Sequence, residues 1–510
     1  MSTTAIAPTR TASALGLRRG SFASLRRLAG HMPLLAVCLI AVGVNLPTLD
    51  DYFHGDDYLA FIDLATVPTL QHLGEVLTFQ DTNVYWRPLG EVYYLVMWES
   101  FGLNEVAYHV ASLSFFVATL ILLYAFCLQA GFGRGVALVA CAFLTLFPNH
   151  VVSVSWITNA PRLMAVLFAL ASLVVLQRAM AGKSWRLEAA SFLLFVLAGL
   201  SDEVALALAP LAPLYGLAFD GEAGGRIKRA LLRGLPYVLL LLLLTPLQFI
   251  GTKNDPGFER IQFGPQMPEH LWALTSKLVW PAKDGIGFGQ ITPDQWAAGA
   301  VALGVFGIAL ITGTNRLRFL VVWVLLGLAP FTLWTAPLAP ARYLYLAAVP
   351  FAIIVAWATV RGVEVLKGTL PGTLVARNLP ASSVVVAATA VVLVFLASVG
   401  ASITQERDRA FARDTETYRI LARGLKEAAP EVPPGARIVI YYGIWNTFYI
   451  WPDAVAKTIY RDREVRVVNV ARGQVDGAAP GRSGKDVVLF YTGRGFIRAA
   501  PVSAAGSALP

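Results

Sequence analysis

The sequence predicts an all-α polytopic membrane protein with a small C-terminal α/β soluble domain, and three observations support this fold class. Of its 510 residues, 56% are hydrophobic and 14% charged, and the mean hydropathy is +0.61, outside the range usual for soluble domains. Most apolar residues lie in runs of about 17 to 25, long enough to cross a bilayer as helices. After Val399 the composition changes to charged and short alternating segments, as expected of a domain outside the membrane.

The chain begins with a basic segment, which we expect to be a cytoplasmic tail over residues 1–30. The apolar run from Pro33 to Pro47 follows it. Because no small-residue cleavage site comes after this run, we interpret it as an uncleaved first transmembrane helix rather than a secretory signal. The tail carries five arginines: Arg10, Arg18, Arg19, Arg26 and Arg27.

Residues 31–402 are predicted to form a transmembrane domain of about 11 helices. Each span is placed by an apolar run, and its boundaries are uncertain by a few residues. The approximate centres of the spans are Leu39, Ala118, Phe143, Leu170, Leu194, Leu211, Leu241, Gly307, Leu325, Ile353 and Val391.

The charge of the connecting loops predicts the orientation. With the N-terminus in the cytoplasm, the even-numbered connections lie inside, and they are short and basic, as the positive-inside rule requires. The opposite connections are longer and richer in Trp, Tyr, Asp and Pro, and they include loops 50–105 and 252–296, which we expect in the periplasm. The prediction is a multi-pass protein of a bacterial inner (cell) membrane.

Residues 403–510 are predicted to form a periplasmic α/β domain with a disordered tail. A charged stretch with helical spacing, Glu406 to Arg413, precedes the proline-rich break Pro430 to Pro434. Three segments then have the length and composition of short buried strands: Ala436–Tyr442, Val465–Val470 and Asp486–Tyr491. The last residues, from Ala499, are expected to be disordered.

Charge and cysteine content exclude two kinds of partner. The net charge of +9 does not indicate nucleic-acid binding, because the basic residues lie in short runs between apolar segments instead of on one soluble face. Cys38, Cys127 and Cys141 all lie inside apolar runs, so neither a disulfide framework nor a thiolate metal site is expected.

Two acidic pairs follow the first span, in the string LDDYFHGDDYLAF. These are Asp50 with Asp51 and Asp56 with Asp57. A carboxylate near the membrane surface can act as a general base toward an acceptor hydroxyl, because partial desolvation raises its proton affinity. It can equally hold a divalent cation against a phosphate, and helix capping by solvated acids explains the same spacing.

Cations and histidines in the outer loops are candidate contacts for a phosphate. Arg87, Arg162 and Arg342 lie in or beside these loops. The positive-inside rule does not require cations on this side of the membrane, and a guanidinium group can contact two phosphate oxygens at once. A snorkelling arginine in an interfacial aromatic belt is the competing interpretation for Arg87. His109 and His150, at the outer ends of spans two and three, suit either phosphate contact or a structural hydrogen bond.

Several strings between Leu46 and Trp357 resemble the GT-C superfamily of membrane glycosyltransferases, and most closely its protein O-mannosyltransferase branch, which includes the transmembrane-and-tetratricopeptide-repeat mannosyltransferases. The tetratricopeptide repeats themselves are missing here. The resemblance rests on the pair Asp56 and Asp57 and on four strings: YWRPLGEVYYLVMWESFGLNEVAYHVASL, FPNHVVSVSWITNAPRLMAVLFAL, LSDEVALALAPLAPLYGLAFD and PARYLYLAAVPF.

The resemblance implies a polyprenyl-phosphate sugar donor and an inverting displacement at the anomeric carbon. It assigns the general base to Asp56, with Asp57 orienting the base or the acceptor. The donor-phosphate-binding candidates are Arg87, Arg162, Arg342, His109 and His150, and the substrate-binding candidates are Glu203, Trp156 and Tyr345.

The sequence departs from the family at two further places. Where relatives often have Ser-Lys-Glu, this chain has Ser201, Asp202 and Glu203, so one cation is missing. The segment Ala111 to Ser114 replaces the string that usually follows His109. No cofactor is expected, although a divalent cation at Asp56 and Asp57 fits the carboxylates equally well.

The function expected from the sequence is transfer of a sugar to a protein, lipid or glycan (polysaccharide) acceptor on the outer side of the membrane, in cell-envelope or protein glycosylation. The alternative from another class is a transporter or flippase of a lipid-linked substrate. Transporters usually place ionisable residues near the bilayer midplane. Here the segment Val238 to Leu244 is wholly apolar and the charged residues gather at the loops, which favours the enzyme.

Overall fold

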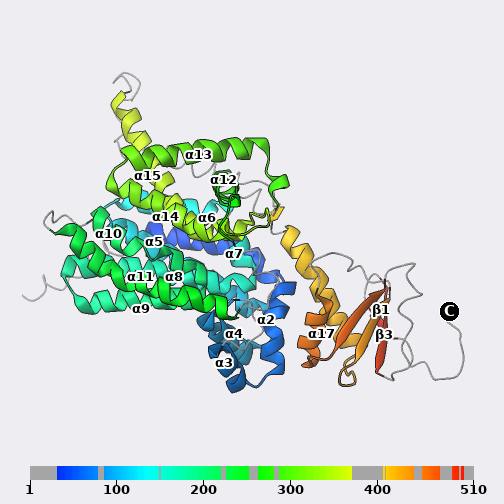
Figure 1. Ribbon diagram of the computed structural model, residues 1–510. Coiled ribbons are helices and arrows are strands. Elements are labelled where there is room, and N and C mark those ends of the chain that lie inside the picture. Colours follow the sequence, from blue (N-terminus) through cyan, green and yellow to red (C-terminus); the bar gives the residue numbers. More distant parts are fainter. Residues whose placement is uncertain are drawn as a thin grey trace, which may run out of the picture.

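A computed structural model shows a bundle of long helices with a small sheet beside it (Figure 1). It describes residues 32–78, 85–148, 151–219, 225–251, 262–280, 287–369, 406–407, 409–441, 451–470, 485–492 and 496–498.

Seven helices in the described part of the chain are long and apolar enough to cross a membrane, so the protein is a multi-pass membrane protein. Seven of the eleven predicted span centres fall within them. They are the first helix Met32–Asp50, whose last turn is η1 (Leu46–Asp50); α5 (Glu105–Gln129); η3 (Ile157–Asn159) with α8 (Ala160–Gly182); α11 (Arg226–Gly251); α13 (Pro293–Thr312); α14 (Asn315–Thr332); and α15 (Tyr345–Thr369) with η7 (Ala341–Leu344).

Three predicted span centres lie in shorter helices. Phe143 is in α6 (Arg134–Leu146), Leu194 in α9 (Trp185–Ser201) and Leu211 in α10 (Leu211–Phe219), which follows the 3-10 turn η4 (Glu203–Leu208). Val391 lies outside the described residues. The total of eleven spans therefore stays a prediction.

Small polar side chains form hydrogen bonds between helices in the middle of the bundle. On α8 and α9, the hydroxyls of Ser172 and Ser191 each donate to the other's backbone carbonyl at 2.7 Å, and the Tyr237 hydroxyl of α11 lies 2.7 Å from that of Ser191. A Cβ added at Gly327 on α14 would lie only 2.9 Å from the backbone nitrogen of Ala347 on α15. Close backbone approach and interhelical hydrogen bonds of this kind hold helices together where lipid removes the hydrophobic driving force.

The two long segments predicted as loops contain helices among their described residues. Residues 50–105 contain α2 (Gly55–Thr66), α3 (Thr69–Leu77) and α4 (Pro88–Phe101), and residues 252–296 contain α12 (Gln266–Val279) and the short η6 (Phe288–Gln290). Between spans lies the short α7 (Val151–Ser155). Tyr58 and Phe61 of α2 and Tyr108 of α5 are fully buried against one another, so this region is a second packed core.

The C-terminal part is an α/β unit formed by a helix over 409–428, the strands and α17 (Pro452–Tyr460). The sheet order is β2-β1-β3-β4, with β1 parallel to β2 and to β3 and with β4 antiparallel to β3. The three predicted strands are confirmed as β1 (Arg437–Tyr441), β2 (Arg466–Val470) and β3 (Asp486–Tyr491). Sequence reasoning missed β4 (Phe496–Arg498) and α17.

This C-terminal unit packs directly on α2. Arg463 forms an ion pair with Asp63 at 2.6 Å, and the Thr458 hydroxyl donates to the Tyr58 carbonyl at 3.4 Å. A side chain at Gly55 would collide with the ring of Tyr418, whose hydroxyl lies closest. Because α2 and the C-terminal unit touch, they lie on the same side of the membrane, and the chain between them crosses it an even number of times.

Candidate functional site

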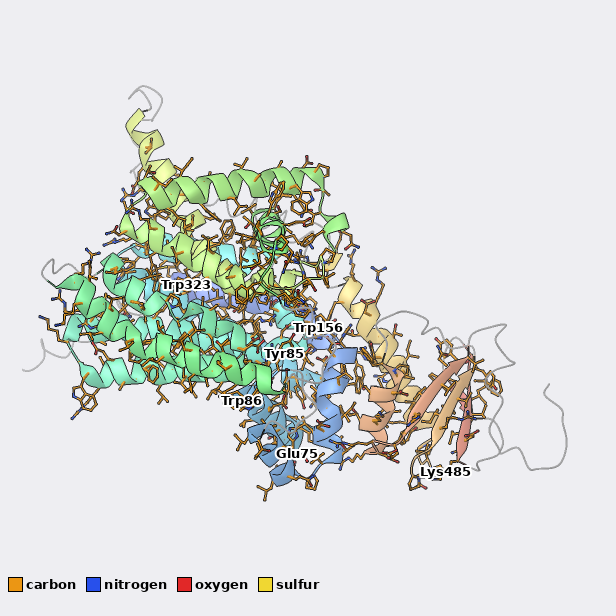
Figure 2. The ribbon with its side chains drawn as sticks, in the orientation of Figure 1. Glu75, Tyr85, Trp86, Trp156, Trp323 and Lys485 are labelled. Atoms are coloured by element: carbon orange, nitrogen blue, oxygen red, sulfur yellow. The ribbon has the colours of Figure 1, made fainter. Side chains whose placement is uncertain are left out.

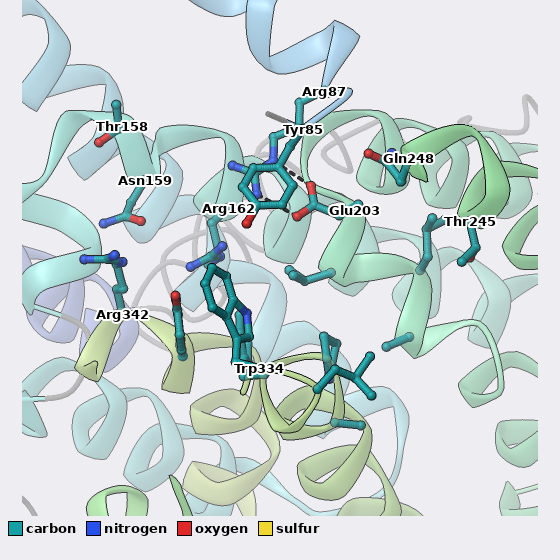
Figure 3. A pocket seen from close by; sticks show the side chains of 18 of the residues that line it. Tyr85, Arg87, Thr158, Asn159, Arg162, Glu203, Thr245, Gln248, Trp334 and Arg342 are labelled. Atoms are coloured by element: carbon teal, nitrogen blue, oxygen red, sulfur yellow. Dashed lines mark hydrogen bonds and ion pairs between the residues drawn. The ribbon is translucent and has the colours of Figure 1, made fainter. Parts of the chain in front are cut away.

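A cavity of about 530 Å³ lies where the bundle meets the outer helices (Figure 3). Figure 2 shows Tyr85, Trp86 and Trp156 at this junction, whereas Trp323 lies within the bundle and Lys485 on the sheet. Charged side chains line one part of the cavity, from α2, the segment before α4, α8, η4 and η7. We call it the charged pocket, and its charged lining residues are Asp56, Arg87, Arg162, Glu203 and Arg342.

The segment before α4 is held so that Arg87 faces the charged pocket. The Trp86 backbone nitrogen donates to Gln248 of α11 at 3.1 Å, and the Gln248 amide donates back to the Trp86 carbonyl at 2.9 Å. The Trp86 indole donates to the Val76 carbonyl at 3.0 Å. Pro88 then begins α4. The first residue of a helix has no intrahelical acceptor for a backbone N–H, so proline loses no hydrogen bond at this position.

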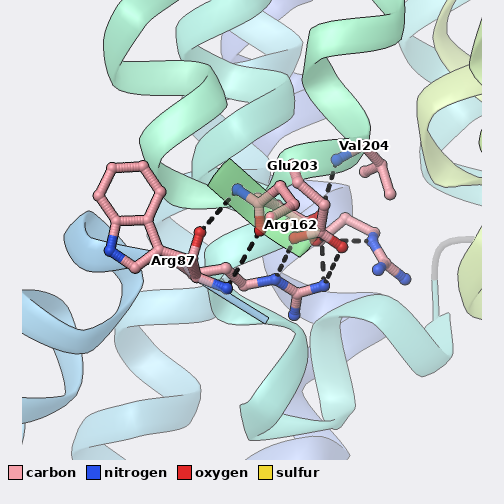
Figure 4. A network of polar contacts seen from close by, with 7 residues as sticks. Arg87, Arg162, Glu203 and Val204 are labelled. Carbon is pink, nitrogen blue, oxygen red and sulfur yellow. Dashed lines mark hydrogen bonds and ion pairs between the residues drawn. The ribbon is translucent and has the colours of Figure 1, made fainter. Parts of the chain in front are cut away.

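Arg87 and Arg162 are neutralised by two carboxylates from the turn after α9 (Figure 4). Arg87 contacts both carboxylate oxygens of Glu203, at 2.6 and 2.7 Å, and lies 3.4 Å from Asp202. Asp202 also accepts from Arg162 at 3.0 Å and from the Val204 backbone nitrogen at 3.2 Å. Burial alone would raise the pKa of Asp202, but Arg162 and Arg87 lower it below its ordinary value.

Asp202 is the central residue of this network, and sequence reasoning treated it only as a departure from the family pattern. It is fully buried and links two guanidinium groups from different segments. Its carboxylate contacts the guanidinium groups of both Arg87 and Arg162. Glu203, predicted from the sequence as a substrate-binding residue, is an ion-pair partner of Arg87 in the structure.

Asp56 and Arg342 are the charged lining residues that have no hydrogen bond or ion pair with the described part of the chain. Asp56 lies in the first turn of α2 and is partly buried. Arg342 lies in η7, with its guanidinium 4.4 Å from the centroid of the Trp156 ring. Among the described residues, the charged pocket therefore presents one carboxylate and one cation whose side chains form no hydrogen bond or ion pair with one another or with other residues.

Asp57 has a different environment from Asp56. It is buried, and its two carboxylate oxygens accept from the backbone nitrogens of His54 at 2.7 Å and Thr158 at 2.8 Å. Burial raises the pKa of Asp57 to about 7, against those hydrogen bonds, which lower it. Asp57 caps α2 and ties it to η3, and it does not line the charged pocket.

The remaining predicted site residues divide into two groups. Trp156 and Glu203 line the charged pocket with the three arginines. His109 is buried in α5, with its Nε2 3.1 Å from the Asp51 carbonyl, and Tyr345 is fully buried at the start of α15, so neither lines the pocket. His150 lies outside the described residues.

His54 and Phe411 belong to this region and were not predicted as site residues. The His54 ring lies 4.6 Å from the ring of Trp156 and 5.9 Å from that of Phe411, on the helix over 409–428. Burial, with a smaller contribution from Arg342, lowers the pKa of His54 to about 4, so the imidazole is neutral at pH 7. Ring contacts from Phe411 through His54 to Trp156 thus connect the C-terminal unit to the guanidinium of Arg342.

The other part of the cavity is apolar. It runs from the arginines past α11 and α12 toward the end of α14. Phe263 in its lining is 87% exposed, which is typical of a side chain that faces lipid. The apolar lining includes Leu241, Phe263, Met267, Pro330, Leu333 and Trp334. A ligand with an anionic head and a long hydrocarbon chain matches the division of the cavity into a charged part and an apolar part.

The described residues contain no group of three or more His, Cys, Asp or Glu placed to hold a metal ion. A cation shared by Asp56 and Asp57 fits poorly, because both oxygens of Asp57 already accept backbone hydrogen bonds. The three cysteines are buried and unpaired, as the sequence predicted.

No protein-family model matches the chain, and no curated protein matches it in sequence. Its structure is similar to that of the archaeal oligosaccharyltransferase AglB from Archaeoglobus fulgidus in complex with an inhibitory peptide and a dolichol-phosphate. The TM-score is 0.51 and the identity 14%, over 86% of this chain and 64% of that chain. ArnT from Cupriavidus metallidurans bound to undecaprenyl phosphate aligns with a TM-score of 0.46 and 14% identity, over 86% of this chain and 85% of that chain.

The likeness to AglB shows the fold. The chain has the predicted all-α membrane architecture with a small C-terminal α/β unit, and its fold is similar to that of this oligosaccharyltransferase. It spans 64% of the length of the oligosaccharyltransferase that it matches.

Proposed function

We propose that this chain is a membrane glycosyltransferase that transfers a sugar from a polyprenyl-phosphate donor to an acceptor hydroxyl. The observation that carries the proposal is that one cavity, which continues into an apolar channel, is lined by both a carboxylate, Asp56, and a cation, Arg342, that have no ion pair with the described residues. The finer assignment to the O-mannosyltransferase branch is part of the same proposal and rests on the sequence strings.

Asp56 is the proposed general base. The acceptor hydroxyl attacks the anomeric carbon from the face opposite the phosphate, and Asp56 takes its proton. The bond between the anomeric carbon and the phosphate oxygen breaks, and its electron pair leaves with the lipid phosphate. The anomeric configuration inverts in this single displacement. A positioned base of this kind contributes about 100- to 10,000-fold in rate.

Arg342 is the proposed partner of the departing phosphate. Negative charge grows on the leaving oxygen in the transition state, and a cation fixed in advance stabilises it most. The Trp156 ring holds the guanidinium in place without neutralising it. Arg87 and Arg162 are held by Glu203 and Asp202, so we assign them to shaping the pocket and its potential, with a weaker direct contact to phosphate.

The apolar part of the cavity suits the first isoprene units of the donor. AglB is in complex with a dolichol-phosphate, a molecule with the same division into phosphate and hydrocarbon. The proposed acceptor is a protein, lipid or glycan on the outer side of a bacterial inner membrane. Because each oxygen of Asp57 already accepts a backbone hydrogen bond and Asp57 does not line the charged pocket, we propose that the reaction needs no divalent cation.

The test is turnover of a panel of polyprenyl-phosphate sugars by full-length protein in lipid nanodiscs. Asp56→Asn is expected to lower the rate by at least about 100-fold while donor binding persists. Asp50→Asn is the matched control, since Asp50 is an exposed acid of the same segment outside the pocket lining, and it is expected to keep wild-type turnover. Full activity of Asp56→Asn removes Asp56 as the base.

Arg342→Gln tests the phosphate contact. It is expected to weaken donor binding about tenfold or more, because hydrogen bonds to a charged group contribute about 1.5–3 kcal/mol. Unchanged donor affinity by titration contradicts the assignment. Wild-type binding of lipid-linked sugars with no turnover on any acceptor supports the transporter alternative instead. Turnover that chelation by EDTA abolishes contradicts the metal-independent mechanism.

A further inference from the structure

The cation assigned to the departing phosphate is held in place by aromatic rings. The Arg342 guanidinium lies 4.4 Å from the centroid of the Trp156 ring and 5.5 Å from that of the Tyr343 ring. The Trp156 ring is the nearer of the two, so its orientation has the larger influence on where the guanidinium points. A binding group is held precisely only when the residues that support it are themselves locked by packing.

Trp156 depends on neighbouring side chains for its orientation. It lies between the short helix α7 and the 3-10 turn η3, which have five and three residues. Such short turns fix the backbone but leave the χ angles of an adjoining Trp to be selected by packing. Trp156 is partly buried, so the rings packed against it select its rotamer.

The rings of His54 and Phe411 both contact the ring of Trp156. The distance between ring centroids is 4.6 Å for His54 and 6.1 Å for Phe411. His54 and Phe411 also stack on each other, with centroids 5.9 Å apart and an angle of 16° between the ring planes. These separations fall in the range at which aromatic pairs attract each other. The two rings therefore restrict the movement of the Trp156 side chain.

Phe411 belongs to the C-terminal unit, and other contacts anchor its helix. This helix is amber in Figure 1 and runs from the bundle toward the sheet. Tyr418 is 2% exposed and stacks on Tyr58 of α2, with centroids 6.2 Å apart. The Arg419 guanidinium donates to the Asp50 carbonyl. The helix is therefore expected to stay attached to the membrane domain when the Phe411 ring is removed.

Anchoring of the helix does not account for the position of the Phe411 ring. The ring lies against His54, directly before α2, and against Trp156, which lines the charged pocket. The Trp156 ring contacts both the Phe411 ring and the Arg342 guanidinium, so it links the C-terminal unit to the cation. The C-terminal unit contributes no described residue to the lining of the charged pocket, so its influence on the pocket is indirect.

We propose that Phe411 is a positioning residue for donor binding. Its ring holds the ring of Trp156 so that the Arg342 guanidinium points into the charged pocket, where the donor phosphate binds. This inference rests on the proposed function, because the donor phosphate is the ligand assigned to Arg342. It gives the C-terminal unit a role in donor affinity without direct contact with the donor.

The test is titration of full-length protein in lipid nanodiscs with polyprenyl phosphate, the leaving group of the proposed reaction. Phe411→Ala is expected to weaken binding about two- to fivefold, the contribution of a cation–π contact at a site that water reaches. Phe411→Tyr keeps the ring and is expected to bind as wild type does. Should Phe411→Ala not fold, Phe411→Leu, which keeps apolar volume without a ring, is measured instead with the same expectation.

A double-mutant cycle separates positioning from a structural role. In an Arg342→Gln background, Phe411→Ala is expected to weaken binding no further, because the group that Phe411 positions is missing. A structural role predicts the same factor in both backgrounds. The matched control is Ile420→Ala, which truncates a partly buried residue of the same helix outside the lining of the charged pocket, and it is expected to bind as wild type does.

The inference is wrong if Phe411→Ala binds with wild-type affinity, if Ile420→Ala shows an equal loss, or if Arg342→Gln leaves the effect of Phe411→Ala unchanged. Each of these outcomes leaves the proposed function standing, because wild type still binds polyprenyl phosphate. Absence of binding by wild type overturns the proposed donor and this inference together.

Discussion

Replacing Asp202 by Asn is the change that most directly tests the charge network beside the charged pocket. The substitution keeps the shape of the side chain and removes its charge. Arg162 then loses its carboxylate, because Asp202 is the one ion-pair partner of Arg162 in the described part of the chain. Arg87 keeps Glu203 at 2.6 Å.

The expected cost follows from burial. The Asp202 side chain is 1% exposed and that of Arg162 is 7% exposed, so the remaining guanidinium has little access to water. Removing one partner of a buried ion pair costs about 3–5 kcal/mol. Glu203 is 18% exposed, and without it Arg87 still has Asp202 at 3.4 Å. Glu203→Gln is therefore expected to cost less, about 1–3 kcal/mol.

The assay is unfolding of the purified protein in mixed micelles, followed by Trp fluorescence. We expect Asp202→Asn to lower the free energy of unfolding more than Glu203→Gln does. The double variant Asp202→Asn with Arg162→Met is expected to recover more than half of the loss, because it leaves no uncompensated buried charge. A smaller effect for Asp202→Asn than for Glu203→Gln, or no recovery in the double variant, would refute the reasoning.

Two further predictions concern α2. The pKa of Asp57 is raised to about 7 from an ordinary 3.8, so the native state binds more protons than the unfolded state between those values, and this group's contribution to stability falls as pH rises from about 4 to 7. Asp57→Asn is expected to remove this loss of stability with rising pH, measured as the change in unfolding midpoint between acidic and neutral pH. The pKa of His54 is lowered, so His54 changes the stability in the opposite direction in both wild type and the variant. An unchanged pH slope contradicts the assignment. Gly55→Ala is expected to push the C-terminal unit away from α2, because the added methyl group collides with Tyr418 and, at 2.8 Å, with Trp451. The measurement is limited proteolysis, which is expected to be faster near residue 430. Gly43→Ala is the control, because a methyl group there has no neighbour within 4 Å.

Much of the fold was predictable because its signals are local. Apolar runs indicate the long helices directly, and the strands β1 to β3 are short runs of β-branched residues. The helices within residues 50–105 and 252–296 were missed because their apolar residues are interrupted by polar ones, and only tertiary packing shows which side is buried. Strand β4 has three residues, too few for any periodic signal.

The candidate site was predictable in composition but not in pairing. Asp56, Arg87, Arg162, Glu203, Trp156 and Arg342 were named from the sequence, and the structure brings all six into one lining. Asp57 is also an aspartate and follows Asp56 directly in the chain. Its side chain nevertheless does not line the charged pocket and accepts hydrogen bonds from the backbone of His54 and Thr158. Which carboxylate contacts which arginine depends on residues far apart in the sequence, 40 positions for Arg162 with Asp202 and 116 for Arg87 with Glu203, and local patterns do not encode such contacts.

The contact between α2 and the C-terminal unit has a consequence for the order in which the protein is made. Tyr58 and Thr458 are 400 residues apart, so the support for the helix that carries Asp56 is synthesised last. At about 5–20 residues per second, translation of the intervening chain takes on the order of tens of seconds. During that time α2 lies at the membrane surface without its partner. The helix that carries Asp56 gains this support only after Thr458 has been synthesised, so a nascent chain that ends before this residue is expected to be inactive.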